Sequence, residues 1–289
     1  MKKVFCFLTL LAALAACGPK SDQPAALATE SANASSGDTL AVFTVVRHAA
    51  DSFSTSAVNV AFPVPNKKQV QLVAAVNEWI SEQLGGTYGD SIEGDYAKLL
   101  ADTAAIADYY FKAVKDNNEK QWKELSADMP KEYLSEMQLF DSVSIEKLAE
   151  GMDWVTFQKV NDVFQGGAHG SHLVFGQTFR KSDGRRIGWD IIRQSPESDL
   201  QELMRKGILE YMRGDNSQLT EEEAMDMLDE SAKYYLPMPQ CPPIFTNEGI
   251  LFLYNQYEIA PYALGLPQFV LTWEKVMPYL NVTAKRMIK

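Results

Sequence analysis

Tight turns between neighbouring strands constrain the fold of this chain more strongly than any other feature of its sequence. Residues 154–164 alternate as a strand does, and residues 171–180 form the next predicted strand. Gly166 to Gly170 join the two strands and include three glycines, which indicates positive φ or a close backbone approach. Ser182-Asp183-Gly184-Arg185 is a hairpin signal at the far end of the second strand. Hairpins pair strands antiparallel, so we expect antiparallel sheet.

The remaining segments interleave strands and helices without an internal repeat. Alternation within the first strand places Lys159 on the same side as Val155 and Phe157. Further strands are predicted at residues 40–48, 56–62, 133–144, 187–192, 244–246, 250–254 and 268–272. Helices are predicted at residues 67–84 (ended by Gly85-Gly86), 96–125, 199–213, 221–228 and 273–280. This mixture predicts an α+β fold of mostly antiparallel sheets with packed helices, and it argues against a doubly wound parallel sheet.

Residues 1–17 have the three parts of a bacterial export signal. Two lysines follow Met1, an apolar segment runs from Val4 to Leu14, and small residues lead to a cysteine. The closing sequence Leu14-Ala15-Ala16-Cys17 resembles the lipobox of bacterial lipoproteins, in which the cysteine becomes the new N-terminus and carries lipid. This resemblance implies lipidation of Cys17. We therefore expect an exported protein that is lipid-anchored to the cell envelope, at the inner or outer membrane and on the periplasmic or surface side.

Residues 18–38 are predicted to be a flexible tether. They contain no aromatic residue and almost no branched apolar one, so they cannot bury enough surface to fold. The region that follows is long enough for one large domain or two small ones. The mature chain would keep two cysteines, and lipidation of Cys17 leaves Cys241 without an intramolecular partner. The fold must therefore be held by its core alone.

The charge balance disfavours nucleic acid as a partner. The chain has 27 basic and 38 acidic residues and a formal net charge of −11, whereas a nucleic-acid-binding protein is expected to carry a basic patch. An acidic surface can attract a cationic protein, and it also provides solubility.

Two further motifs resemble a known family of envelope proteins. Residues 161–170, Asn-Asp-Val-Phe-Gln-Gly-Gly-Ala-His-Gly, followed by Phe179 and Gly184, look like the start of the C-terminal domain of the anti-sigma factor RsiV. Residues 245–252 and 257–265 resemble the closing pattern of that domain. The same domain occurs in the peptidoglycan deacetylase PdaC and in many exported lipoproteins.

The resemblance covers about residues 153–280 and implies a division of the chain. Residues 39–150 would form a small N-terminal α/β subdomain, and residues 151–289 an RsiV-like C-terminal domain. In RsiV this domain binds lysozyme, and in PdaC the deacetylase activity belongs to a separate catalytic domain. The resemblance therefore implies a binding or sensing role and supplies no catalytic residues.

The candidate binding residues come from the glycine motif and the aromatic-rich C-terminal region. Aromatic rings suit a sugar-stacking groove or a protein hot spot, although a large core would use them too. The candidates are Gly166, Gly167, His169, His172, Tyr257, Glu258 and Tyr262. The expected ligand is a lysozyme-like protein or a peptidoglycan glycan, in addition to the membrane reached through the N-terminal lipid.

No metal, cofactor or catalytic site is predicted. His169 and His172 are three residues apart, which on a strand directs them to opposite faces, and no further ligand spacing completes a metal site. Ser171 lies beside His172, but neighbours in a strand rarely form a nucleophile and base pair. Cys241 is expected to be a buried, small apolar residue. Carboxylates of a glycosidase could lie anywhere in the chain, so a glycan hydrolase in the envelope is the alternative function.

Overall fold

The computed structural model describes residues 39–88, 103–134, 137–193, 197–214 and 218–288. The export signal, Cys17 and the tether predicted at residues 1–38 lie outside these residues. Within the described part of the chain, no helix is both long and apolar enough to cross a membrane.

A five-stranded sheet forms the larger part of the molecule. Its strands are β1 (Val42–Ala50), β2 (Ser54–Pro63), β3 (Leu139–Glu150), β4 (Trp154–Phe164) and β5 (Ser171–Arg180), which lie side by side in chain order. Three neighbouring pairs are antiparallel, while β2 and β3 are parallel. A parallel pair needs a crossover connection, and here the chain between β2 and β3 contains the helices. The predicted α+β class with mostly antiparallel sheet is confirmed.

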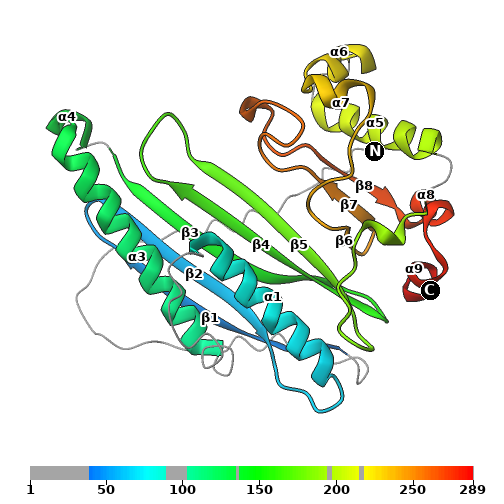
Figure 1. The fold of residues 1–289 in the computed structure, drawn as a ribbon, viewed down its shortest axis with the longest axis horizontal. Helices are drawn as coiled ribbons and strands as arrows, with labels where there is room; N and C mark the ends of the chain where they lie inside the picture. The colour runs from blue at the N-terminus through cyan, green and yellow to red at the C-terminus, as the bar shows by residue number, and fades with distance from the viewer. Residues whose placement is uncertain (1–38, 89–102, 135–136, 194–196, 215–217, 289) are drawn as a thin grey trace, which may run out of the picture.

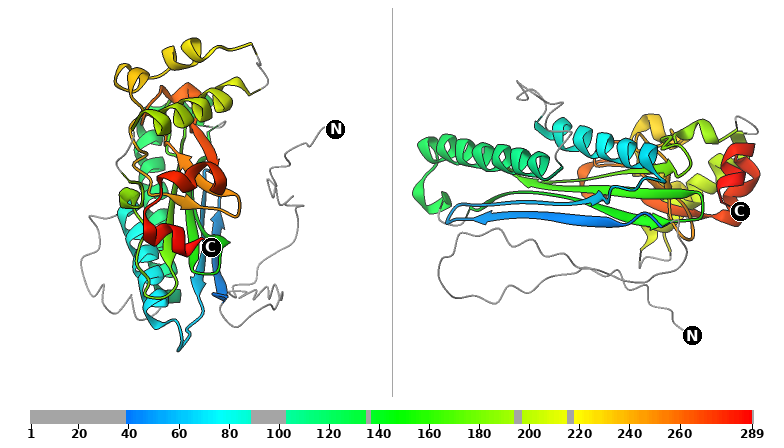
Figure 2. Two further views of the ribbon diagram at one scale, coloured as in Figure 1. Left: turned by 90° about the vertical axis from the view of Figure 1, so that its right-hand side faces the viewer. Right: turned by 90° about the horizontal axis from the view of Figure 1, so that it is seen from below.

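Two helices cover one face of this sheet (Figures 1 and 2). They are α1 (Val70–Tyr88) and α3 (Thr103–Asp128), followed by the short α4 (Lys131–Leu134). Alternate residues of each strand point at the helices and bury their apolar side chains there, as Val58, Phe157 and Phe179 do, each at 0 % exposure. Sheet and helices thus form two layers around one core. The sheet also positions the β4–β5 hairpin and the C-terminal unit.

The C-terminal part forms a second, smaller unit at one end of the sheet (Figure 1). Its three-stranded antiparallel sheet contains β6 (Ile244–Phe245), β7 (Gly249–Leu253) and β8 (Gln268–Thr272). Its helices are α5 (Glu197–Arg213), α6 (Glu221–Asp226), α7 (Glu230–Tyr234), α8 (Trp273–Val276) and α9 (Val282–Met287), with single turns at Trp189–Ile191, Tyr262–Leu264 and Met277–Tyr279. These elements enclose a separate apolar core, to which Tyr254 contributes a fully buried ring.

The two units meet on the outer edge of β5. An edge strand exposes unpaired backbone groups, and here the C-terminal unit covers them. The Sγ atom of Cys241 accepts a hydrogen bond from the Gly176 amide at 3.2 Å, and Thr178 Oγ1 accepts one from the Phe245 amide at 3.0 Å. Cys241 is free and buried, and burial raises the pKa of its thiol to about 11, so it acts here as a packing residue, as expected.

Several predicted elements differ from the structure. The predicted end of a helix at Gly85-Gly86 is wrong, because α1 continues to Tyr88. The strand predicted at residues 133–144 begins only at Leu139, since the segment before it contains α4. Residues 187–192 form no strand, because the Asp-Gly turn is followed by an isolated bridge between Phe179 and Arg186 and then by a single helical turn.

The sheet runs without a break across the predicted division of the chain at residues 150 and 151. Strands β3 and β4 flank that position and pair from Phe140↔Phe164 to Glu150↔Val155. The apolar core of the C-terminal unit consists mainly of residues after β5, and Trp154 of β4 also contributes to it.

Candidate binding site

The tip of the β4–β5 hairpin carries the glycine motif. Gly166 and Gly167 both have positive φ, 86° and 111°, which side chains rarely tolerate. A Cβ atom on Gly166 would lie 2.8 Å from Leu125 Cδ1 of α3, so this glycine also permits a close approach. The predicted reason for these glycines is confirmed at both positions. His169, two residues after Gly167, reaches the C-terminal unit, where its ring stacks on that of Tyr262.

Three aromatic side chains from the two sequence motifs meet on the surface. The ring of His169 stacks on that of Tyr262, with centroids 3.8 Å apart and an interplanar angle of 20°. Tyr257 Oη lies 3.3 Å from His169 Nε2, and its ring centroid is 5.9 Å from that of Tyr262. Tyr257 is 61 % exposed and His169 is also exposed, so core packing does not explain the arrangement. We call these three residues the aromatic cluster.

Tyr257 lies in a strained turn that Glu258 holds closed. Tyr257 has φ = 65°, and it is the only non-glycine residue with positive φ in the described part of the chain. This conformation is costly for a bulky side chain and marks functional sites more often than chance. The carboxylate of Glu258 accepts hydrogen bonds from the amides of Asn255 at 2.9 Å and Gln240 at 2.6 Å. Glu258, a candidate binding residue, therefore positions the turn and is not one of the exposed rings.

Asn255 and Gln256 fix the turn against the edge of β5. The Asn255 side chain pairs with Val174 as a strand would, accepting from its amide and donating to its carbonyl, both at 2.9 Å. Gln256 Oε1 accepts a hydrogen bond from the His172 amide at 3.1 Å. The sequence motifs did not single out these two amides, although both directly precede the Tyr257-Glu258 motif.

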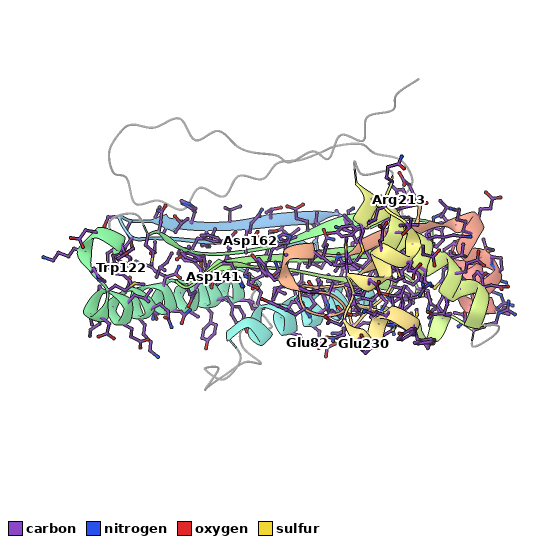
Figure 3. All side chains as sticks on the ribbon, turned by 90° about the horizontal axis from the view of Figure 1, so that it is seen from above. Glu82, Trp122, Asp141, Asp162, Arg213 and Glu230 are labelled. Atoms are coloured by element: carbon purple, nitrogen blue, oxygen red, sulfur yellow. The ribbon has the colours of Figure 1, made fainter. Side chains whose placement is uncertain are left out.

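His172 does not join the aromatic cluster. Its ring nitrogen Nδ1 lies 2.5 Å from Asp162 Oδ1, across the β4–β5 pair, and both side chains are about half exposed. Figure 3 labels Asp162 on the sheet. Ser171 lies on the opposite face, because strand neighbours alternate, so Ser171 and His172 cannot act as a nucleophile and base pair. No group of three metal-ligating side chains occurs among the residues that the structure describes.

The other aromatic residues near this motif divide between core and surface. Tyr254 is fully buried and donates a hydrogen bond from Oη to the Pro237 carbonyl at 2.8 Å, which makes it a core residue. Trp273 packs on Phe245 of the C-terminal unit and on Trp154 of β4. Of the candidates, the structure therefore brings together His169, Tyr257 and Tyr262, with Glu258 as a support and Gly166-Gly167 as the turn that delivers the histidine.

Comparison with known proteins adds a domain and a fold. The model of the DUF3298 family, described as a protein of unknown function, matches residues 190–274, so the C-terminal unit contains a DUF3298 domain. A DUF3298-family protein from Bacteroides fragilis has a similar structure, with a TM-score of 0.63 and 18 % identity over 86 % of this chain and 98 % of that one. A DUF3298-family protein from Pseudomonas aeruginosa gives 0.53 and 10 %, over 85 % and 96 %. No curated protein matches the chain.

At sequence identities this low, the similarity to the two structures shows a shared fold and nothing further. The matched region includes the turn with Tyr257 and Tyr262 and excludes the hairpin with His169. The resemblance to the RsiV domain over residues 153–280 stays a prediction.

Proposed function

We propose that this protein is an exported lipoprotein, anchored to the cell envelope through lipid on Cys17, whose folded part binds an envelope ligand. The ligand is a protein such as lysozyme or a glycan strand of peptidoglycan. One observation carries the proposal: two motifs 88 residues apart in sequence form an exposed aromatic cluster on a strained, tightly held turn. Exposed rings at low entropic cost are the anchors of protein interfaces, and they also stack on sugars.

The support around the aromatic cluster favours a binding surface. Asn255 and Glu258 fix the turn through backbone hydrogen bonds, so the rings are held in place before any ligand arrives. Such preorganisation reduces the entropy lost on binding. The acidic net charge of the chain favours a cationic protein as ligand.

A retention assay tests the proposal. The purified protein is applied to immobilised lysozyme and to insoluble peptidoglycan, and the bound fraction is measured for the natural chain and for a Tyr257→Ala/Tyr262→Ala variant. We expect retention on one of the two matrices and its loss in the variant. Tyr234→Ala/Tyr235→Ala is the matched control, because those two tyrosines are 83 % and 52 % exposed elsewhere on the C-terminal unit.

Two results would contradict the proposal in different ways. Absence of retention on both matrices removes the binding role. Release of soluble sugar from peptidoglycan would instead identify an envelope glycan hydrolase. The anchor is tested separately, by comparing the membrane fraction of the natural chain with that of Cys17→Ser, which we expect to be released.

A further inference from the structure

We propose that a polar cavity between the helices and strands β3 to β5 is a second binding site, which takes an uncharged ligand rich in hydroxyl and amide groups, such as a short N-acetylated oligosaccharide. The cavity has a volume of about 600 Å³, within the usual range for small-molecule sites. It lies on the helix-covered face of the sheet, and its lining residues do not include His169, Tyr257 or Tyr262. The proposal therefore does not depend on the aromatic cluster.

Three polar side chains lie buried at positions where the sheet otherwise presents apolar residues to the helices. Asp141 is 1 % exposed, Lys159 4 % and Asn161 5 %, while Val143 and Phe157 occupy neighbouring positions on the same face. Figure 3 shows Asp141 between the strands and α3. Burying such groups costs free energy that a purely structural sheet would avoid with apolar side chains. Their presence around a cavity indicates a ligand.

The charges in the cavity offset each other. Lys159 Nζ donates a hydrogen bond to the Gln83 carbonyl at 2.7 Å and lies 5.8 Å from the centre of the Phe175 ring. Burial lowers the pKa of Lys159 to about 8, and the carboxylate of Asp141 acts in the opposite direction. At the mouth, Glu82 Oε2 is paired with the Arg186 guanidinium at 2.6 Å. A ligand with a net charge would disturb this balance, so an uncharged one fits.

Side-chain amides supply hydrogen-bonding groups in fixed orientations. Asn117 donates to Gln165 Oε1 at 3.0 Å, and Gln165 donates in turn to Asn118 Oδ1 at 3.3 Å. Asn161 donates to the Ser142 carbonyl at 3.2 Å. Amide groups both donate and accept, which suits hydroxyl and acetamido groups of a sugar.

The cavity also has an apolar side, formed by Val163, Leu173 and Phe175. A pyranose ring has polar edges and an apolar face, so a cavity lined by both polar and apolar side chains matches it. Ser171, half-buried at the end of β5, completes this side with a hydroxyl group that lines the cavity.

The test measures binding of the trimer of N-acetylglucosamine to the full chain by titration calorimetry. Ser171→Leu places a larger apolar side chain in the cavity without removing a buried charge, and we expect affinity to fall about tenfold or more as the hydrogen-bonding groups are covered. Ser144→Leu is the matched control, since Ser144 is also half-buried on a strand but lies on the opposite face. It should bind as the natural chain does, and thermal melts confirm that each variant folds.

The same titration separates this site from the aromatic cluster. Tyr257→Ala/Tyr262→Ala should bind the trimer unchanged. Unchanged affinity in Ser171→Leu overturns the proposal, as does absence of binding to the natural chain. Loss of trimer binding in the tyrosine variant alone would also overturn it and would assign the sugar to the aromatic cluster, which supports the function proposed above.

Discussion

Near the β4–β5 hairpin, polar side chains on the two faces of these strands lie in different environments. On the face covered by α1 and α3, Lys159 and Asn161 are almost completely buried. On the other face, Asp162 and His172 form a pair that is about half exposed. Because strand residues alternate, Asn161 and Asp162 are neighbours in sequence and yet lie in these two different environments.

The difference shows which charged side chains affect the stability of this fold most. A solvent-exposed pair of this kind contributes only about 0–1 kcal/mol even when both groups are charged, since solvent screens it. A buried ammonium group costs several kcal/mol, and hydrogen bonds and a nearby carboxylate recover only a part. The buried face should therefore respond to pH and to mutation much more strongly than the exposed face.

The largest expected effect comes from Lys159. Its pKa in the folded chain is about 8, below the usual lysine value of 10.5, so the unfolded chain binds the proton more tightly. The cost of burying the charge is fully present below pH 8 and disappears as pH rises to 10.5. Relative to Lys159→Met, the natural chain should thus gain about 3 kcal/mol in its free energy of unfolding over that interval. Denaturant unfolding of both proteins across the range measures this gain.

The control for Lys159 is Lys68→Met, which removes one lysine charge from an exposed position before α1. Each variant is compared with the natural chain. Other titrating groups change the free energy of unfolding of both proteins equally, so their contributions cancel in the difference. A difference between the natural chain and Lys159→Met that stays constant with pH would show that Lys159 is not buried as a cation.

The next largest change in stability is expected where the two units meet, on the face of β5 that carries His172. A Cβ atom on Gly176 would lie 2.4 Å from Cγ1 and 2.5 Å from Cδ1 of Ile244. Gly176→Ala should therefore destabilise the protein by about 2 kcal/mol through overpacking. Gly188→Ala is the control, because it has φ = −117° and its nearest atom would be Asp190 Oδ1 at 3.2 Å. Thermal unfolding should show little change for Gly188→Ala.

A double variant identifies the contact that causes the loss. Shortening the neighbour with Ile244→Val should make Gly176→Ala less harmful than it is in the natural chain, because residues in contact are not additive. Strict additivity of the two changes would contradict overpacking against Ile244.

Periodicity and turn chemistry predicted much of the five-stranded sheet. The bounds of β4 and β5 agree with the predicted residues, and alternation correctly placed Lys159 beside Val155 and Phe157. The parallel pairing of β2 with β3 was not predictable, because it depends on how the chain crosses over through two helices. The extension of α1 through Gly85 shows tertiary packing overriding a local stop signal, since Leu84 and Gly85 are both buried.

The aromatic cluster was only partly predictable. The sequence motifs singled out His169, Tyr257 and Tyr262, but only the fold shows that they stack on one another. The polar cavity was missed altogether, although a lysine among inward-facing apolar residues was a signal for it. Local patterns indicate which face a residue occupies, whereas a cavity depends on side chains from separate helices and strands.

A smaller effect is expected where the turn is fixed to β5. Asn255→Ala removes both side-chain hydrogen bonds to Val174 and leaves its amide without that partner. We expect a loss of about 1–1.5 kcal/mol and faster hydrogen exchange at the Val174 amide. The Leu173 amide faces β4 instead and serves as the control within the same protein. Equal acceleration at both amides would indicate opening of the whole strand rather than loss of the Asn255 contact.

The smallest expected change in stability separates the backbone strain at Tyr257 from the contacts of its ring. Tyr257→Ala and Tyr257→Gly both remove the ring, but only glycine adopts φ = 65° without cost. Tyr257→Gly should therefore be more stable than Tyr257→Ala by about 1 kcal/mol, the reverse of their order in a helix. Denaturant unfolding measures the difference, and both variants should lose ligand retention equally. Equal stability of the alanine and glycine variants would show that the backbone at Tyr257 is not strained. Retention of the ligand by the glycine variant would show that the Tyr257 ring does not contribute to binding.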